Sequence, residues 1–552
     1  MKTFEKRWFM WDFARLRNFN REEFLLVADK LKELGYNGIG LYLEGAFDFK
    51  SIDGILRDGV MTYDDAKWAK AECEKRGIFL FPMTNVVGHM EHFLRQERFK
   101  YLKEDFETAS YDVAFQTPEA EDFAMNIIHE YLNAFDLKYI HIGGDEVKLT
   151  EANKPVYAKF LAKLCDNLLA EGVTPGIWND LIWAHPELCE PFSRDVEIFD
   201  WSYHGHRRGS IELFINEGFK NIYACPCENS WVGFINHQYE SKWAGGDGDH
   251  VEPDEIEAFL NDAIENEKCT EPKALITHWE ASQGRDLWGQ WSALARAGLF
   301  MTGDLKYQEQ NDEMIERAIF GRVTPYTEIA RIIREEIQCK VAVPGKTTIT
   351  QLAFIRKTLF IPATFKDILY KASCGNKVNT RSEIYRITCG GHIDHEAINK
   401  SLDKCDALLK TWTPEGAFEE RCFISMTSIL SMTRAAFALY KAAADCDKYY
   451  TAAAQQQFSD PENAKKLAIE FAEGFKRANE KIDVYREDIS RLIECTGHTA
   501  TDLIRLDIIM DLVDSIVDYI EGFVMSDTFD RIPLPAFQYI LNWVVNLDLI
   551  DR

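Results

Sequence analysis

The chain has 552 residues, of which 46% are hydrophobic and 13% aromatic, so a large folded core is expected and disorder is not. This length indicates two or three domains rather than one. Asp and Glu number 90 against 63 Lys and Arg, which gives a formal net charge of −27. Such a negative field disfavours binding to nucleic acid or to an anionic membrane.

The sequence also bears on the cellular compartment. Residues 1–15 lack the apolar stretch of a secretory signal peptide, and no run of about 18 apolar residues predicts a membrane-spanning helix. The 13 cysteines are scattered, and Cys225-Pro226-Cys227 lacks the C-x-x-C spacing of zinc and redox sites. We therefore expect a cytoplasmic protein with neither a membrane nor a nucleic-acid partner.

Short apolar runs alternate with amphipathic helical stretches up to about residue 300. The helical stretches include Arg21–Leu34, Tyr63–Lys75 and Pro118–Phe135. The runs are near-continuously apolar, as parallel strands buried on both faces are. They are Trp8–Trp11, Ile39–Leu43, Ile78–Met83, Leu137–Ile142, Thr174–Trp178, Val196–Trp201, Asn221–Ala224 and Ala274–Thr277.

Eight such strand–helix units predict an α/β fold, a (β/α)8 TIM barrel, over residues 1–304. A doubly wound open sheet is the alternative, but its Gly-rich turn after the first strand is missing. After about residue 305 the strand pattern stops, and residues 305–552 are expected to form an all-α C-terminal domain. Its amphipathic segments are Tyr326–Gln338, His395–Thr411, Ser425–Ala444, Asn463–Glu494 and Ala500–Ile520.

The hexapeptide His141-Ile142-Gly143-Gly144-Asp145-Glu146 closes the fourth predicted strand. Glycine lets a backbone or ligand approach closely, and two adjacent carboxylates repel, which pushes their pKa values apart. Separated pKa values suit acid–base chemistry on one substrate. Taken alone, a surface loop with two solvated acids explains the motif equally well. Its place at the carboxyl end of a barrel strand favours a site.

Other polar residues also follow predicted strands, namely Asp12, Glu44, His89, Asp180, Tyr203, Asn229 and Glu280. Four tryptophans lie at or after strands five to eight, namely Trp178, Trp201, Trp231 and Trp279. A single Trp is ordinary core, but four at one rim suggest a cup with apolar walls that suits the faces of sugar rings. Asp180 and Glu280 are then expected to accept hydrogen bonds from sugar hydroxyls.

The stretch His89-Met90-Glu91-His92 invites a metal interpretation, with His141 and Asp145 as further ligands. Its spacing is not the H-E-x-x-H of zinc sites, so we expect no metal. We expect instead that Glu44 orients His89, which in turn contacts the catalytic acid and tunes its protonation. A hydrogen-bonded core histidine is an equally good interpretation of His89.

Residues His141 to Glu146 match the H-x-G-G-D-E signature of glycoside hydrolase family 20, the β-N-acetylhexosaminidases. Arg7, followed by Met10–Arg15, resembles the first strand of that family, with Arg7 in the place of its sugar-binding arginine. Residues 82–91, 93–94 and 99–102 resemble the third-strand segment of the hexosaminidase D-like branch. Trp178-Asn179-Asp180 and Trp279 resemble its fifth- and eighth-strand tryptophans. The resemblance covers residues 5 to about 300.

The resemblance implies an exo-acting hydrolase, without a cofactor, that removes terminal N-acetylglucosamine or N-acetylgalactosamine from glycans or glycoconjugates. In such enzymes the substrate's own 2-acetamido oxygen attacks C1. Asp145 would then orient the acetamido group, and Glu146 would protonate the leaving oxygen and later deprotonate water. Tyr203 would bond the acetamido oxygen. The other residues expected at the substrate are Arg7, His89, His141, Trp178, Asp180, Trp201, Trp231, Trp279 and Glu280.

The sequence also departs from the family pattern. Trp8 replaces a usual glycine, Glu44-Gly45 replaces an acid pair, and the turn after Glu280 differs, which leaves the gluco or galacto preference open. We expect no counterpart of the family's usual small α/β domain before the barrel. The helical domain is therefore expected to support the barrel or to form a homodimer interface. The alternative functions are an amino-sugar-binding barrel with little or no turnover and a metal-dependent barrel hydrolase.

Overall fold

The computed structural model describes residues 2–545 except 16, 55, 58, 104–111, 202–208, 229–254, 281–285, 339–340, 344–345, 348–358, 360–361, 375–391 and 394. Eight parallel strands close into a barrel in sequence order. The strands are β1 Lys6–Asp12, β2 Gly38–Tyr42, β3 Phe79–Met83, β4 Tyr139–His141, β5 Thr174–Trp178, β6 Glu197–Trp201, β7 Ile222–Cys225 and β8 Lys273–His278.

The pairing of β1 with β8 closes the barrel, with Trp11 opposite His278. This closure confirms the predicted barrel and contradicts the open doubly wound sheet, in which the first and last strands are not neighbours. All eight predicted strands are present, and their bounds differ from the prediction by at most two residues.

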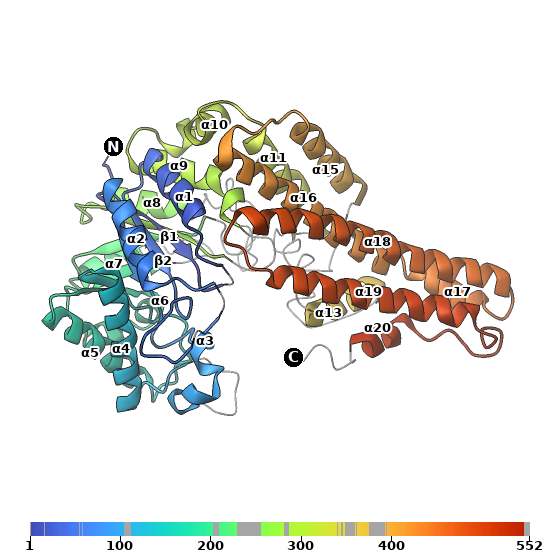
Figure 1. Ribbon diagram of the computed structural model, residues 1–552, viewed down its shortest axis with the longest axis horizontal. Helices are drawn as coiled ribbons and strands as arrows, with labels where there is room; N and C mark the ends of the chain where they lie inside the picture. The colour runs from blue at the N-terminus through green and yellow to red at the C-terminus, as the bar shows by residue number, and fades with distance from the viewer. Residues whose placement is uncertain are drawn as a thin grey trace.

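Helices surround the barrel in the left half of Figure 1. Three of them begin at the predicted residues because a side chain caps each N-terminus. Asn20 accepts a hydrogen bond from the backbone N–H of Glu23, and Thr62 forms a capping box with Asp65. The helices of this half are α1 Arg21–Glu33, α2 Tyr63–Lys75, α3 Glu91–Leu94, η1 Glu97–Leu102, α4 Pro118–Phe135, α5 Lys154–Ala170, α6 Asp180–Ala184, η2 Pro186–Cys189, α7 Ser210–Asn216, α8 Glu255–Glu265, η3 Leu287–Gly289 and α9 Trp291–Met301.

The rest of the chain is largely helical, as predicted, and α18 and α19 form an arm that extends away from the barrel (Figure 1). A small antiparallel sheet of β9 Val341–Val343, β10 Lys346–Thr347 and β11 His392–Ile393 interrupts the helices, which the sequence pattern did not predict. The helices are η4 Tyr307–Glu309, α10 Asp312–Phe320, α11 Tyr326–Ile332, η5 Ile333–Gln338, α13 Pro362–Cys374, α15 His395–Leu409, α16 Gly416–Ala444, η7 Asp447–Thr451, α17 Ala452–Gln456, α18 Pro461–Cys495, α19 Thr501–Met525 and α20 Phe537–Val545.

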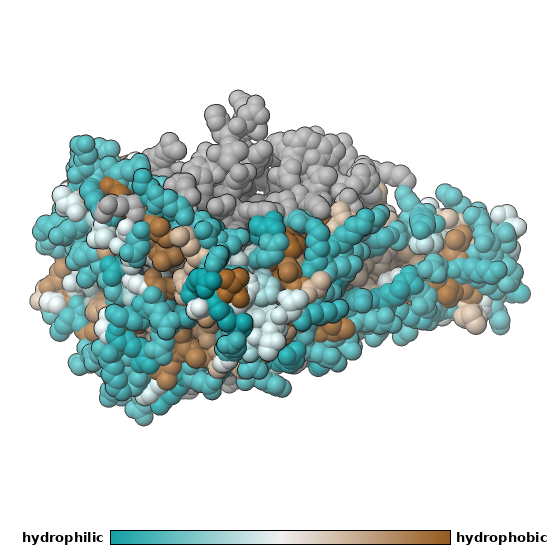
Figure 2. All heavy atoms as spheres, turned by 90° about the horizontal axis from the view of Figure 1, so that it is seen from above, coloured by the Kyte–Doolittle hydropathy of each residue, from teal (hydrophilic) through white to brown (hydrophobic). Residues whose placement is uncertain are grey.

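One helical stretch of the described residues, Gly416–Gln456, is long and apolar enough to cross a membrane by length and composition. However, 78% of its most apolar window is buried inside the protein, which is also how the core helix of a soluble protein is placed. Figure 2 shows a face that is mainly hydrophilic, with hydrophobic residues in small separate groups. This surface agrees with the strongly acidic composition.

Aromatic side chains fill the barrel interior from one end to the other. The ring of Trp8 lies 4.9 Å from that of Tyr223, and Tyr223 stacks on Phe199 at 4.3 Å. Phe199 contacts His141 at 4.7 Å, and His141 contacts Trp178 at 4.3 Å. The barrel is therefore a packed core whose amino-terminal end is closed, and Trp8 belongs to that end.

Candidate active site

The double glycine after β4 lets the chain turn outward at the carboxyl end of the barrel. Gly143 and Gly144 have φ angles of 79° and 100°, which favour glycine. A Cβ on Gly143 would overlap the side chain of Asn85, and one on Gly144 would lie 2.6 Å from Leu161. The turn is thus packed against the residues after β3 and against α5, and it presents Asp145 and Glu146 to the mouth of the barrel.

Backbone strain is concentrated at this mouth. Among the described residues, four that are not glycine have a positive φ, and three of them are Glu44 (42°), His89 (51°) and Glu146 (51°). Each follows the end of a barrel strand, whereas the fourth, Asp136, ends helix α4. A non-glycine residue in this region costs about 1–3 kcal/mol, and such residues cluster at functional sites. The three strained residues are among the polar residues that the sequence analysis placed after the predicted strands.

The two adjacent acids have different surroundings. The side chain of Glu146 is 55% exposed, and its Oε2 lies 3.0 Å from Nε2 of His89. The side chain of Asp145 is 7% exposed, lies 3.7 Å from the same imidazole nitrogen and accepts a hydrogen bond from Asn85. Glu146 is therefore accessible from the open mouth of the barrel, while Asp145 is buried and fixed by Asn85.

His89 lies among carboxylates and is positively charged. Burial alone would lower its pKa, but the hydrogen bond to Glu146, the close approach of Glu91 and the nearby charges of Asp145 and Glu44 raise that pKa to about 11. An imidazolium donates from both ring nitrogens, so it can hold Glu146 in one orientation. The prediction that His89 contacts the candidate acid agrees with this geometry.

A third acid supports the turn from the start of α6. Oδ2 of Asp180 accepts a hydrogen bond of 3.1 Å from the backbone N–H of Glu146. Burial and the charges of Asp145 and Glu146 raise the pKa of Asp180 to about 7. Burial also raises the pKa of Asp145, with Glu146 acting in the same direction and His89 against it. The mouth therefore concentrates carboxylates, which can stabilise positive charge on a bound group.

Two of the predicted tryptophans form a wall beside these acids. The rings of Trp178 and Trp279 lie 6.2 Å apart and both side chains are almost completely buried. His141 supports Trp178 from within the barrel, where burial lowers its pKa far below the usual value, so the imidazole is neutral. The guanidinium of Arg15 lies 4.7 Å from the ring of Trp279. Trp201 ends β6 and is partly buried.

The expectation that Arg7 binds the sugar is wrong. Arg7 lies near the start of β1, and its guanidinium donates to the backbone oxygens of Gly35 and Phe4, both at 2.6 Å. Parallel strands place their amino ends opposite the site, so Arg7 is on the far side of the barrel. The arginine at the carboxyl end of β1 is Arg15, which pairs with Asp12 at 2.9 Å.

The expectation that Glu280 accepts hydrogen bonds from sugar hydroxyls is also contradicted. Its carboxylate pairs with Arg17 and lies 3.0 Å from Nε2 of His278, and the side chain is 4% exposed. Burial alone would raise the pKa of Glu280, but Arg17 and His278 lower it to about 2. Glu280 is therefore part of a buried ion network and does not face the open mouth of the barrel.

Glu44 is not the direct partner predicted for His89. It accepts a hydrogen bond of 2.6 Å from the hydroxyl of Tyr42, and burial together with Glu91 raises its pKa to about 7, although Arg15 acts in the opposite direction. The carboxylate that approaches Nδ1 of His89, at 3.7 Å, is Glu91. Glu44 therefore acts on His89 through its charge at longer range.

The proposed metal ligands do not converge. Nε2 of His92 lies 2.8 Å from the backbone oxygen of Ala14, and Nδ1 of His141 accepts from the backbone N–H of Gly143. Within the part of the chain that the structure describes, no group of three or more His, Cys, Asp or Glu side chains is arranged to hold a metal ion. Tyr203, Trp231 and Asn229 lie outside the described residues, so their predicted roles stay predictions.

Sequence reasoning missed two residues that the structure places at the mouth. Asn85 donates to Asp145, and its own Oδ1 accepts from the backbone N–H of Gly144 at 3.1 Å. Its position two residues after β3 was the available signal. Arg15 lies three residues after β1, where the barrel rule would have found it.

The fold and this site define a (β/α)8-barrel protein with paired acids and an aromatic wall at the carboxyl ends of its strands, suited to acid–base chemistry on a sugar. Residues 44–224 match the model of the glycosyl hydrolase family 20 catalytic domain. This part of the chain, which includes Asp145 and Glu146, is therefore similar to that catalytic domain.

Among curated relatives, the chain is similar to a beta-hexosaminidase of Akkermansia muciniphila, with 29% identity over 216 residues. This match spans 35% of the chain and 42% of that relative. Among solved structures, the chain resembles a β-N-acetylhexosaminidase of Bacteroides fragilis, with 17% identity, a TM-score of 0.41 and coverage of 53% of this chain and 65% of that one. A Vibrio harveyi exo β-N-acetylglucosaminidase gives 16% identity, a TM-score of 0.43 and coverage of 59% and 58%.

Proposed function

We propose that the chain is an exo-acting β-N-acetylhexosaminidase that works by substrate-assisted retention. The observation that carries the proposal is the different support given to the two adjacent acids, with His89 on Glu146 and Asn85 on Asp145. An exposed carboxyl beside a charged imidazole can exchange protons with a leaving group and with water. A buried carboxylate held by an amide can orient a substrate N–H and oppose positive charge on it.

The mechanism assigns the two steps to the same pair. In the first step, the 2-acetamido oxygen of the sugar attacks C1, the glycosidic C1–O bond breaks, and Glu146 gives its proton to the leaving oxygen. Asp145 accepts a hydrogen bond from the acetamido N–H and stabilises the oxazolinium ion. In the second step, Glu146 takes a proton from water as the water oxygen bonds to C1, and the bond between C1 and the acetamido oxygen breaks, which restores the acetamido group. The wall of Trp178 and Trp279 packs against the apolar part of the substrate.

Activity on aryl N-acetyl-β-glucosaminide tests the proposal directly. Glu146→Gln should lower kcat by about 10²–10⁴-fold, the range of general acid–base catalysis. The matched control is Glu151→Gln, a fully exposed carboxylate five residues further along that pairs with Lys154. The control should keep the wild-type kcat.

The matching aryl glucoside without the acetamido group tests the mechanism. Its turnover should be negligible, because the substrate would lack its internal nucleophile. Comparable turnover of both substrates would contradict substrate assistance. Wild-type binding of N-acetylglucosamine without hydrolysis would favour a sugar-binding protein instead.

A further inference from the structure

A turn of the helical region, Thr496–His498, is inserted beside the mouth of the barrel between α18 and α19. Arg17 and His498 form an antiparallel bridge, and the backbone N–H of Asn18 donates to the oxygen of Gly497 at 2.6 Å. The backbone N–H of Gly497 donates in turn to Glu23 at 2.8 Å. The turn is thus joined to the segment that follows β1 by backbone as well as side-chain bonds.

The fit at this turn leaves no room for a side chain. A Cβ added to Gly497 would overlap the backbone oxygen of Asn18 and would lie 3.2 Å from a carboxylate oxygen of Glu23. Backbone atoms cannot move aside as a flexible side chain does. Gly497 therefore permits the close approach of the helical region to the barrel.

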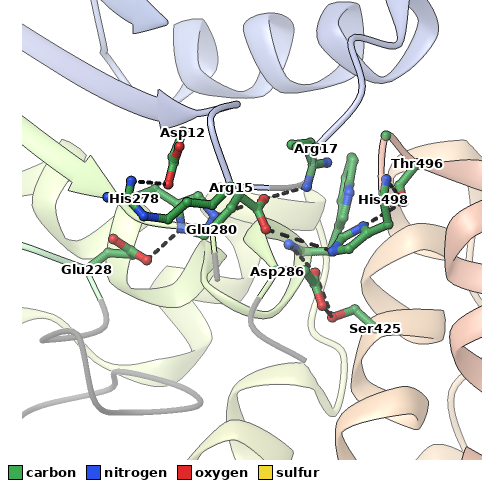
Figure 3. A network of polar contacts seen from close by, with 12 residues as sticks. Asp12, Arg15, Arg17, Glu228, His278, Glu280, Asp286, Ser425, Thr496 and His498 are labelled. Atoms are coloured by element: carbon green, nitrogen blue, oxygen red, sulfur yellow. Dashed lines mark hydrogen bonds and ion pairs between the residues drawn. The ribbon is translucent and has the colours of Figure 1, made fainter. Parts of the chain in front are cut away.

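Buried charges continue the contact into the barrel (Figure 3). Arg17, 1% exposed at its side chain, pairs with both Glu23 and Glu280. Glu280 also faces Nε2 of His278 at 3.0 Å and Nε2 of His498 at 3.8 Å. A second contact to the helices is the hydrogen bond from the Ser425 hydroxyl of α16 to Asp286 at 2.8 Å. Buried charges of this kind are stable only while their partners stay in place.

The network ends at the wall of the candidate site. Glu280 directly follows Trp279, so the pairing of its carboxylate fixes the main chain beside that ring. The guanidinium of Arg15, which pairs with Asp12, covers the ring of Trp279 from outside. Glu146 and His89 come instead from the other side of the mouth, after β4 and β3.

We propose that the Thr496–His498 turn is a positioning element of the site. Through Arg17 and Glu280, the turn holds Trp279, one of the two wall tryptophans, and the neighbouring Arg15 in the geometry that binds the sugar. This inference rests on the proposed function for its substrate. The turn acts on sugar binding rather than on proton transfer, because the acid and its histidine lie outside the network.

Gly497→Ala tests the inference, with Gly522→Ala as the matched control. Gly522 lies in α19, and a Cβ there would meet nothing within 4 Å. In Gly497→Ala we expect KM for aryl N-acetyl-β-glucosaminide to rise about tenfold while kcat stays within threefold of wild type. The control should match wild type in both constants.

Hydrogen exchange of residues 273–280 provides a readout without substrate. It should become at least tenfold faster in Gly497→Ala than in the control, because β8 loses its anchor. An unchanged KM, a loss confined to kcat, or unchanged exchange would each overturn the inference. If Gly497→Ala does not fold, His498→Ala is judged by the same criteria, since its side chain faces Glu280 from the same turn.

An inactive wild-type protein would contradict the proposed function, but it would not contradict the coupling, by which we mean the effect of the Thr496–His498 turn on residues 273–280. In that case, the exchange of residues 273–280 decides, because it depends on contacts within the protein alone. Fast exchange in Gly497→Ala with slow exchange in Gly522→Ala supports the coupling. Equal exchange in both overturns it.

Discussion

At the scale of single residues, the two arginines of the first strand region have opposite positions and should have different effects. Arg15 lies over Trp279 with 27% of its side chain exposed. Arg15→Gln should therefore raise KM for aryl N-acetyl-β-glucosaminide by at least tenfold and change kcat less, because uniform binding to substrate is lost.

Arg7→Gln is the matched comparison for that prediction. Its guanidinium bonds two backbone oxygens at the closed end of the barrel. Loss of these charge-assisted bonds should lower the free energy of unfolding by about 1–3 kcal/mol and leave KM unchanged. Thermal unfolding and steady-state kinetics of both variants check this assignment. A raised KM in Arg7→Gln alone would contradict it.

Asp180 should make stability depend on pH. Its pKa of about 7 lies above the value of 3.8 for an unperturbed aspartate, so the folded state binds the proton more tightly. The resulting stability is complete below about pH 4 and is lost as the pH rises through 7. Asp180→Asn removes this loss. The difference in Tm, variant minus wild type, should be more positive at pH 8 than at pH 5, and an equal difference at both would contradict the shift.

At the scale of elements, the turn after β4 should tolerate no side chain. Gly144→Ala would place a Cβ 2.6 Å from Leu161 at a φ of 100°. We expect a loss of about 1–3 kcal/mol of stability from strain, together with a loss of activity because the turn carries both acids. Gly172→Ala has a φ of 72° and nothing within 4 Å, so it should lose stability while keeping kcat. Tm and kcat of both variants measure the contrast.

The sequence predicted the elements better than the side-chain directions. Periodicity located all eight strands, because a strand buried on both faces is apolar throughout. It did not give the partners of the side chains at the strand ends. The family resemblance places Arg7 at the sugar, although Arg7 precedes the first strand's apolar run and lies at the closed end of the barrel. Glu280 follows the last strand as expected, but its carboxylate belongs to an ion network. The pairing of Glu280 with Arg17 and His498 depends on residues far apart in the chain, which spacing does not reveal.

At the scale of the whole molecule, the barrel and the helices share a core. Trp288 and Trp291 are fully buried, and their rings lie 5.3 and 4.9 Å from that of Phe418 in α16. The predicted division at residue 304 would separate these side chains. The division of the chain into residues 1–304 and 305–552 stays a prediction of sequence, and so does a homodimer through the helical region.

A shortened chain tests how far the two parts depend on each other. Residues 1–304 alone would expose Trp288 and Trp291 and leave Arg17 without the Thr496–His498 turn. We expect this fragment to aggregate or to unfold at a much lower temperature than the full chain, because exposed aromatic surface promotes association. Size-exclusion chromatography and thermal unfolding measure it. A monodisperse fragment with the Tm and activity of the full chain would contradict the shared core.

The aromatic column from Trp8 to Trp178 closes the barrel at one end, so the site has a single opening. Substrate, water and released sugar must all pass through the same opening, because packed rings close the opposite end of the barrel. In the proposed reaction, the leaving group departs in the first step and the sugar in the second, and both use this opening. We therefore expect the free sugar product to compete with substrate for entry to the site.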